Sequence, residues 1–212
     1  MAGSDGPWWR AAVALAVVVL VGGCGDGSSL PELTLPASAS ASSTATVESE
    51  PTPAGARYGA TGLDLCGLVD LDPLAALALT VESTDATPPQ SAPGAACLFK
   101  LVTRSGHLAN LRVETSTPAT VEEAEKLYHD RGEFTVMLPE GGVPGLGDQA
   151  AAFSRRTEPG FKYAEYMIHV QLANLMVLVW LAVGGNEFVP GEQLATPTRT
   201  IAEATLALVP YA

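Results

Sequence analysis

The side chains of this chain that could do chemistry include three cysteines and three histidines, and Cys24 has the most informative surroundings. It follows an unbroken apolar run over residues 11–21 and two glycines. A short apolar run that ends in small residues is typical of a signal peptide, and a cysteine at that point accepts the lipid of a bacterial lipoprotein. We therefore predict a signal peptide over residues 1–23 and lipidation of Cys24. An ordinary signal peptide or an uncleaved anchor is the alternative.

Two cysteines, Cys66 and Cys97, remain once Cys24 is lipidated. A pair of cysteines in an oxidising compartment is most simply a disulfide. A redox or metal role is the alternative, but the sequence contains no C-x-x-C motif and two distant cysteines are too few ligands for a metal. We therefore expect a structural disulfide between Cys66 and Cys97.

The histidines give no recognisable catalytic or metal motif. His107, His129 and His169 have no mutual spacing of two or four residues, and no H-E-x-x-H, G-x-S-x-G, S-x-x-K or phosphate-binding loop occurs. We expect no metal, no cofactor and no enzymatic activity. A hydrolase would need His169 to meet Asp148 or Glu165 within hydrogen-bond distance.

A glycine-rich run over residues 141–148 is a further candidate for ligand contact. Gly145, Gly147 and Asp148 could supply an anion-binding backbone nest, with Asp148 as a possible acid. The alternative is a tight turn, in which glycines permit positive φ and an aspartate closes the turn through its own backbone. We favour the turn.

Charge excludes one class of partner. The chain has 212 residues, a net charge of −12 and a pI of about 4.5. Such a surface repels phosphate backbones, so nucleic acid is not an expected partner. It also repels anionic lipid headgroups, so the expected membrane contact depends on the lipid at Cys24.

Composition divides the mature chain in two. Residues 24–57 start at the lipidated cysteine and are rich in Ser, Thr, Ala and Pro, which predicts a disordered tether. Residues 58–212 have the length and apolar content of one domain. Their patterns predict helix, two strands, helix, several strands and helix, which is an α+β fold with helices packed on an antiparallel sheet.

Several local expectations follow from the same patterns. We expect a loop over residues 84–94, a capping box between Thr120 and Glu123, and an ion pair between Glu122 and Lys126. Three strands are expected over residues 149–155, 162–172 and 175–183, the last of them central because it is apolar on both faces. Thr196 and Pro197 are expected to begin the last helix.

Four features together resemble a known family. They are the Leu-Val-Gly-Gly-Cys end of the leader, the tether, the Cys66–Cys97 pair and the run Val-Pro-Gly-Leu-Gly-Asp over residues 143–148. This combination resembles the actinobacterial lipoproteins catalogued as domain of unknown function 3558. The glycine run is also similar to a segment of the extracytoplasmic sensor domains of some mycobacterial kinases. The resemblance implies an exported, disulfide-bonded α+β domain of unassigned activity.

The expected function is that of a membrane-anchored, extracytoplasmic binding or sensing module. Its partner would be a small apolar ligand, an envelope component or an envelope protein. Such a module should carry a pocket or an exposed apolar patch between sheet and helices. A lipid carrier with a larger cavity and a hydrolase without a recognisable motif are the alternatives.

Overall fold

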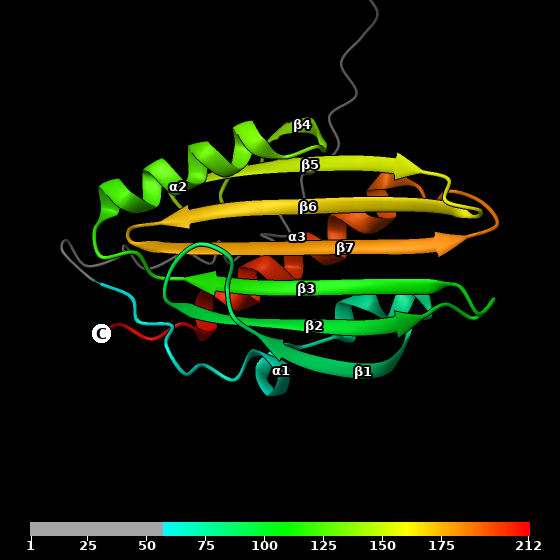
Figure 1. Cartoon of the computed structure of the whole chain (residues 1–212), viewed down its shortest axis with the longest axis horizontal. Helices are drawn as coiled ribbons and strands as arrows, with labels where there is room; N and C mark the ends of the chain where they lie inside the picture. Colours follow the sequence, from blue (N-terminus) through cyan, green and yellow to red (C-terminus); the bar gives the residue numbers. More distant parts are fainter. Residues whose placement is uncertain (1–56) are drawn as a thin grey trace, which may run out of the picture. The chain divides into compact units, whose positions relative to one another are not determined.

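A seven-stranded antiparallel sheet forms the centre of the domain (Figure 1). The computed structural model describes residues 57–212, so the predicted signal peptide, Cys24 and the predicted tether up to residue 56 lie outside the described residues. Neighbouring strands follow the order β1-β2-β3-β7-β6-β5-β4, and every neighbouring pair is antiparallel. The predicted α+β class with an antiparallel sheet is confirmed.

The elements follow one another along the chain as short helices, hairpins and two longer helices. In chain order they are α1 (Leu65–Leu68), the 3₁₀ helix η1 (Asp72–Leu77), β1 (Thr80–Thr87), β2 (Gly94–Val102), β3 (Leu108–Ser116), α2 (Val121–Phe134), β4 (Leu138–Gly142), β5 (Gln149–Thr157), β6 (Lys162–Leu172), β7 (Leu175–Gly185) and α3 (Gly191–Leu208).

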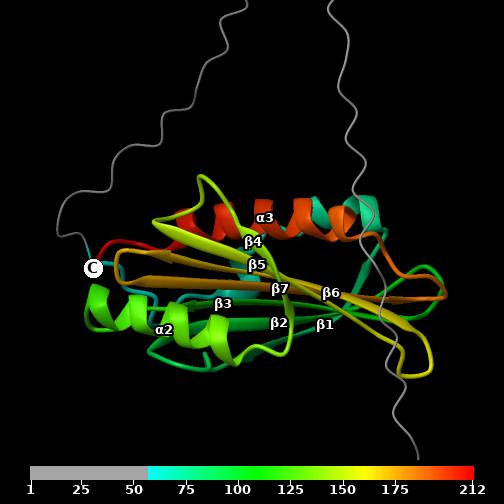
Figure 2. The same ribbon diagram turned by 90° about the horizontal axis from the view of Figure 1, so that it is seen from above.

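One face of the sheet packs against α3 and forms the main apolar core, whereas α2 lies on the opposite face (Figure 2). Alternate residues of the strands face α3, such as Val113 of β3 and Ile168 of β6, and both are at least 99% buried. On α3 the inward positions Leu194 and Ile201 repeat at about two helical turns and complete this core.

Strand β7 lies at the centre of the sheet between β3 and β6. Nine of its eleven residues are buried, because α3 covers one of its faces and α2 part of the other. The expectation of a central strand is therefore confirmed. Among the described residues, no helix has the length and apolar character needed to cross a membrane.

Helix α2 begins with the first half of the expected capping box, whereas the returning bond from Glu123 goes to the residue before the N-cap. Thr120 accepts a hydrogen bond from the amide of Glu123 at 3.1 Å, and the Glu123 carboxylate accepts from the amide of Ala119 at 2.9 Å. Only Ala124 of this helix is fully buried, and a small apolar cluster lies on the same side of the sheet, made of Met137, Phe153, Met167 and Leu178. Helix α2 thus covers its face of the sheet less completely than α3 covers the other.

Two expectations about secondary structure are wrong. The predicted loop over residues 84–94 is strand β1 up to Thr87, followed by a loop over residues 88–93. This strand is the sheet edge and almost all of its residues are exposed, so it lacks the alternation that identifies a half-buried strand. Helix α3 begins at Gly191, and Pro197 lies inside it, because residues 191–195 extend the helix before the Thr-Pro pair.

The ion pair expected between Glu122 and Lys126 is also absent from the described residues. Lys126 pairs with Asp130, which lies one turn further along α2. Both positions are four residues from Lys126, so spacing alone does not choose between them.

The predicted disulfide between Cys66 and Cys97 is present and joins α1 to β2, with a Cα–Cα distance of 5.2 Å. The two ends of the described chain also meet. Tyr58 and Tyr211 form an isolated β-bridge with their rings 4.8 Å apart, and the Asn174 side chain accepts a 2.8 Å hydrogen bond from the amide of Tyr58.

Candidate functional site

The face of the sheet beneath α2 carries an unusual concentration of buried polar side chains. Strand registers place four of them on this face, and each is at least 97% buried: Glu114 and Ser116 of β3, and His169 and Gln171 of β6. Burial of a polar group costs free energy unless the group is hydrogen-bonded. The hydrogen-bond partners of these side chains therefore show which of them stabilise the fold and which are left unpaired.

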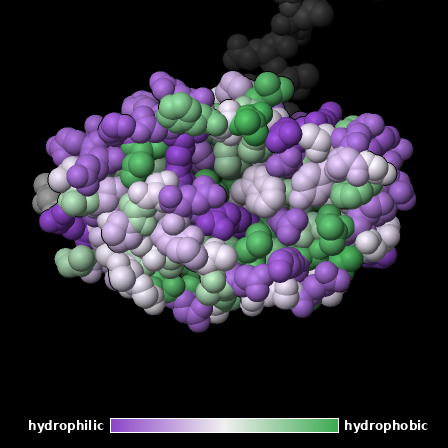
Figure 3. All heavy atoms as spheres, viewed as in Figure 1, coloured by the Kyte–Doolittle hydropathy of each residue, from purple (hydrophilic) through white to green (hydrophobic). Residues whose placement is uncertain are grey.

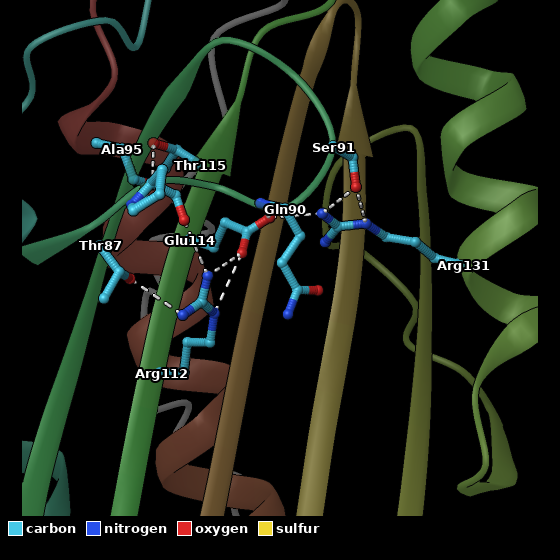
Figure 4. Close-up of polar contacts among 9 residues, drawn as sticks. Thr87, Gln90, Ser91, Ala95, Arg112, Glu114, Thr115 and Arg131 are labelled. Carbon is cyan, nitrogen blue, oxygen red and sulfur yellow. Dashed lines mark hydrogen bonds and ion pairs between the residues drawn. The ribbon is translucent and has the colours of Figure 1, made fainter.

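Glu114 is fully paired. Its carboxylate binds Arg112 of the same strand at 2.8 Å and Arg131 of α2, and it accepts from the amide of Gln90 at 3.1 Å. Figure 4 shows Arg131 reaching from α2 across the sheet, where it also donates to Ser91 at 2.8 Å. One carboxylate therefore holds together a central strand, helix α2 and the loop over residues 88–93.

Opposing effects determine the ionisation of Glu114. Burial by itself raises the pKa of this carboxyl, but the hydrogen bonds and charge of Arg131 together with the bonds from Arg112 and Gln90 lower the pKa below its usual value. Glu114 is thus a carboxylate at neutral pH, and its negative charge compensates the two guanidinium groups. The cluster is suited to fastening α2 to the sheet.

His169 differs from Glu114, because both its ring nitrogens lack a hydrogen-bond partner among residues 57–212, as do Ser116 Oγ and Gln171 Oε1 on the same face. The side chain is 97% buried and its ring lies 5.2 Å from that of Phe153. It lines a pocket of about 220 Å³ between α2 and the strands β5 and β6. His169, Phe153 and Ala151 belong to the sheet side of this pocket, which is hereafter called the His169 pocket.

The helix side of the His169 pocket comes from successive turns of α2. Tyr128 and Gly132 are four residues apart, as are His129 and Glu133, so each pair lies on one side of the helix. His129 and Glu133 are exposed, and therefore belong to the mouth of the pocket. The pocket combines an aromatic interior with a buried imidazole and a carboxylate at the opening.

Burial lowers the pKa of His169 to about 4, and the positive charge of Arg131 acts in the same direction while Glu114 partly opposes it. The imidazole is therefore neutral at neutral pH. One of its nitrogens is then a hydrogen-bond donor and the other an acceptor.

The described residues do not bring His169 together with the acids that a hydrolase would need. Glu165 accepts a hydrogen bond from Trp180 Nε1 at 3.1 Å, and Asp148 accepts from the amide of Ala173 at 2.7 Å. Within residues 57–212, no group of three or more His, Cys, Asp or Glu side chains is arranged to hold a metal ion. His107 lies in the turn after β2, where Ser105 contacts its Nδ1 at 2.9 Å.

The glycine-rich run has a bracing role in the described structure. The amide of Asp148 donates to the carbonyl of Gln171 at 2.8 Å, and its carboxylate accepts from Ala173, which has a φ of +49° in the turn between β6 and β7. At Gly147, with a φ of +62°, a Cβ atom would lie 2.5 Å from the Gln171 oxygen. The expectation that Asp148 closes its own turn is wrong for the described residues, because its side chain bonds to the neighbouring turn at Ala173, and glycine at 147 allows this close approach.

Gly145 also has a positive φ, of +74°, and lies beside Arg199 of α3. Arg199 donates to the carbonyl of Pro144 at 3.1 Å. The run over residues 143–148 is therefore joined to both α3 and the sheet.

A second hollow flanks α2 on the side of the loop over residues 88–93. This groove has a volume of about 480 Å³ and combines small apolar groups with Leu127, Glu123, Lys126 and Asp130 of the helix. On the face seen in Figure 3, hydrophobic residues form separate islands among hydrophilic ones. This face therefore carries no broad apolar docking patch.

The comparisons with known proteins identify no relative. No protein-family model matches the chain, and no match is found among curated proteins or solved structures. The functional argument therefore depends on the site itself.

Sequence reasoning placed His169 on a strand but did not identify its pocket or the Glu114 cluster. Helix α2 and strand β6 are distant in sequence, so nothing local indicates that one covers the other. The sequence contains one indication of the Glu114 cluster. Arg112 and Glu114 alternate with apolar residues in a predicted strand, and the helix that follows carries another arginine, Arg131.

Proposed function

We propose that this chain is a lipid-anchored, extracytoplasmic binding module without catalytic activity, and that the His169 pocket is its ligand site. The observation that carries the proposal is a neutral, buried imidazole without a hydrogen-bond partner in a pocket between α2 and the sheet. A buried unsatisfied polar group costs about 1–3 kcal/mol, so an unpaired imidazole beside a pocket is a feature that the fold retains at a cost.

The proposed location depends on the leader sequence. The apolar run before Cys24 supports export and lipidation, and the Cys66–Cys97 disulfide is of the kind that persists in oxidising compartments. Membership of the actinobacterial lipoprotein family resembled by the sequence is part of the same proposal.

The alternatives need features of a different kind. A lipid carrier needs a cavity for acyl chains, whereas the His169 pocket is smaller than the range of about 300–1,000 Å³ typical of drug-sized ligands. A hydrolase needs an acid beside His169, whereas Glu165 and Asp148 form hydrogen bonds elsewhere.

Native mass spectrometry of the mature protein, purified from its own membranes, tests the binding function. We expect an additional mass on the folded protein that is lost on denaturation and is reduced in a His169→Phe variant. A bare lipoprotein mass, together with no ligand-induced change in the imidazole proton signals of His169, would contradict the proposal. The chain has only three histidines, so comparison with His169→Phe assigns that signal.

Membrane fractionation tests the anchor separately. The intact mass should show acyl groups on Cys24 in the wild type, and a Cys24→Ala variant should lose both the acyl mass and the association with membranes. Retention of membrane binding by an exported, unacylated Cys24→Ala protein would show that another anchor is used.

A further inference from the structure

We propose that helix α2 is a hinged lid, which lifts from the sheet while the rest of the domain stays folded and thereby uncovers His169 and the sheet face around it. Such a movement needs no ligand and therefore goes beyond the proposed function. Three features of the structure support it: the sparse packing of α2, the unpaired polar atoms beneath it and the unequal attachment of its two ends.

The inward side of α2 buries fewer residues than that of α3, which covers the opposite face (Figure 2). Only one of the fourteen residues of α2, Ala124, is buried, whereas six of the eighteen residues of α3 are. Another inward position of α2 is Gly132, where an added Cβ would lie 3.9 Å from the Phe153 ring, in ordinary contact without a clash. Because each buried apolar side chain raises the free energy of opening an element, α2 should open more readily than α3.

Unpaired polar atoms lie beneath α2. Four buried side-chain atoms lack a hydrogen-bond partner within residues 57–212, and the strand registers place all four on the α2 face: Ser116 Oγ, Gln171 Oε1 and the two ring nitrogens of His169. On α3, by contrast, the buried hydroxyls of Thr198 and Thr205 each donate to a backbone carbonyl at 2.7 Å. Opening of α2 would let water pair with the four atoms, which lowers the free energy of opening.

The start of α2 is firmly attached. Immediately before the helix, the Asn174 side chain donates to the carbonyl of Pro118 at 3.1 Å, and the Arg57 side chain donates to the carbonyl of Ala119. Asn174 also binds Tyr58, so these contacts join the start of α2 to the turn after β6 and to the first described residues. The segment over residues 117–120 is therefore the hinge of the proposed movement.

The end of α2 depends on one side chain. Phe134 and Val136 are 81% and 76% exposed, so the chain that leaves the helix packs little against the sheet. Within residues 57–212, Arg131 is the only side chain of α2 that bonds to the sheet or to the loop over residues 88–93, through Glu114 and Ser91 (Figure 4). Loss of these bonds would release this end of the helix while the hinge stays in place.

Methionines report on the movement. The chain from Cys24 onwards contains three of them, and all are buried on the α2 face: Met137, Met167 and Met176. Hydrogen peroxide transfers one oxygen atom to an accessible methionine sulfur, which becomes a sulfoxide, and leaves water. The rate of this oxidation therefore measures how often the face beneath α2 is uncovered.

Hydrogen exchange of the folded mature protein in mild detergent tests the inference, and methionine oxidation in dilute peroxide is the second measurement. We expect the amides of α2 beyond its first turn to exchange at least about tenfold faster than those of α3. The three methionines should be oxidised faster than the global unfolding rate allows. Amides of α2 and methionines that react only through global unfolding would overturn the proposal.

Two variants with opposite effects separate lid opening from a general loss of stability. Arg131→Met should speed exchange in α2 and oxidation of the methionines by about tenfold or more, because a hydrogen bond to a charged group contributes at least that factor, and should leave exchange in α3 unchanged. Gly132→Ala adds a contact with Phe153 and a better helix former, so it should slow both reactions by about two- to fivefold.

The matched control is Lys126→Met, which removes an exposed ion pair within α2 and should change either rate by about twofold or less. Equal acceleration of α2 and α3 by Arg131→Met would indicate global unfolding and overturn the lid, as would unchanged rates in Gly132→Ala. Because no ligand takes part, these outcomes leave the proposed binding function to be judged by its own test.

Discussion

His169 and Glu114 lie in one cross-strand row of the sheet, each directly opposite Leu178 of β7, yet their polar environments are opposite. Glu114 binds two guanidinium groups and a backbone amide, whereas His169 has no hydrogen-bond partner among the described residues. The same covered face therefore combines a satisfied charge, which fastens α2, with an unsatisfied neutral group, which lines a pocket.

His169 should make the fold sensitive to mild acid. Its pKa is lowered from 6.5 to about 4 in the folded protein, so the unfolded chain binds the additional proton between these values. By linkage, the free energy of unfolding should fall as the pH decreases from about 6.5 to 4, by about 3 kcal/mol in total. Urea unfolding of wild type and His169→Phe at several pH values measures this effect, and most of the decline should be absent from the variant.

Glu114 contributes in the same direction as His169, but in a lower pH range. Its folded pKa is below the ordinary value of 4.5, so the stabilisation that it provides is complete above that value and is lost only as the pH falls through the folded pKa. Between pH 4.5 and 6.5 the decline should therefore come mainly from His169. An undiminished decline in His169→Phe over this range would contradict the assignment.

Removal of the Glu114 charge should be strongly destabilising. Glu114→Gln leaves two largely buried guanidinium groups without a counter-charge, and breaking a buried pair in this way costs about 3–5 kcal/mol. Chemical unfolding of the variant measures the cost. The exposed pair between Arg199 and Glu203 provides the control, because Glu203→Gln should cost less than about 1 kcal/mol. Similar losses in both variants would mean that the cluster does not fasten α2.

Gly147→Ala should destabilise the fold by about 2–4 kcal/mol, because the new methyl group meets the Gln171 oxygen and the backbone is held at positive φ. Gly160→Ala is the matched control: it also has a positive φ, of +94°, but no atom lies within 4 Å of its added Cβ. We expect about 1 kcal/mol for the control. Equal costs measured by thermal or urea unfolding would show that close packing at Gly147 is unimportant.

Replacement of both Cys66 and Cys97 by serine should lower the free energy of unfolding by about 3–4 kcal/mol, since the disulfide closes a loop between residues 31 apart. The intact mass of the wild type should be two hydrogens lower before reduction than after it. A double variant as stable as the wild type would indicate that the bond contributes little to the fold.

The sequence predicted best those elements whose side chains alternate between two different environments. Strand β6 has the predicted bounds, because apolar residues face α3 along it while polar ones mostly face α2. Strand β1 was missed because both faces of this edge strand meet solvent, and the start of α3 was placed too late because Thr196 and Pro197 have the composition of a helix start.

The candidate site was less predictable than the fold. His169, Arg131 and Glu114 come from separate elements, and their relation depends on how α2 crosses the sheet. Alternation along β6 identifies the face to which His169 points, but not which element covers that face. Local patterns therefore predict strands and caps, whereas the pocket requires the tertiary structure.

The meeting of Tyr58 and Tyr211 makes the domain topologically suited to circular permutation. The amide of Ala212 donates to the carbonyl of Arg57 at 2.7 Å, so a short peptide could join the two ends. New termini could then be opened at the exposed turn over residues 104–106, which joins the end of β2 to the start of β3. In the permuted chain the predicted tether would be attached at residues 104–106, while α2 and the sheet stay unchanged. The choice of attachment point would then set how the His169 pocket is oriented relative to a membrane.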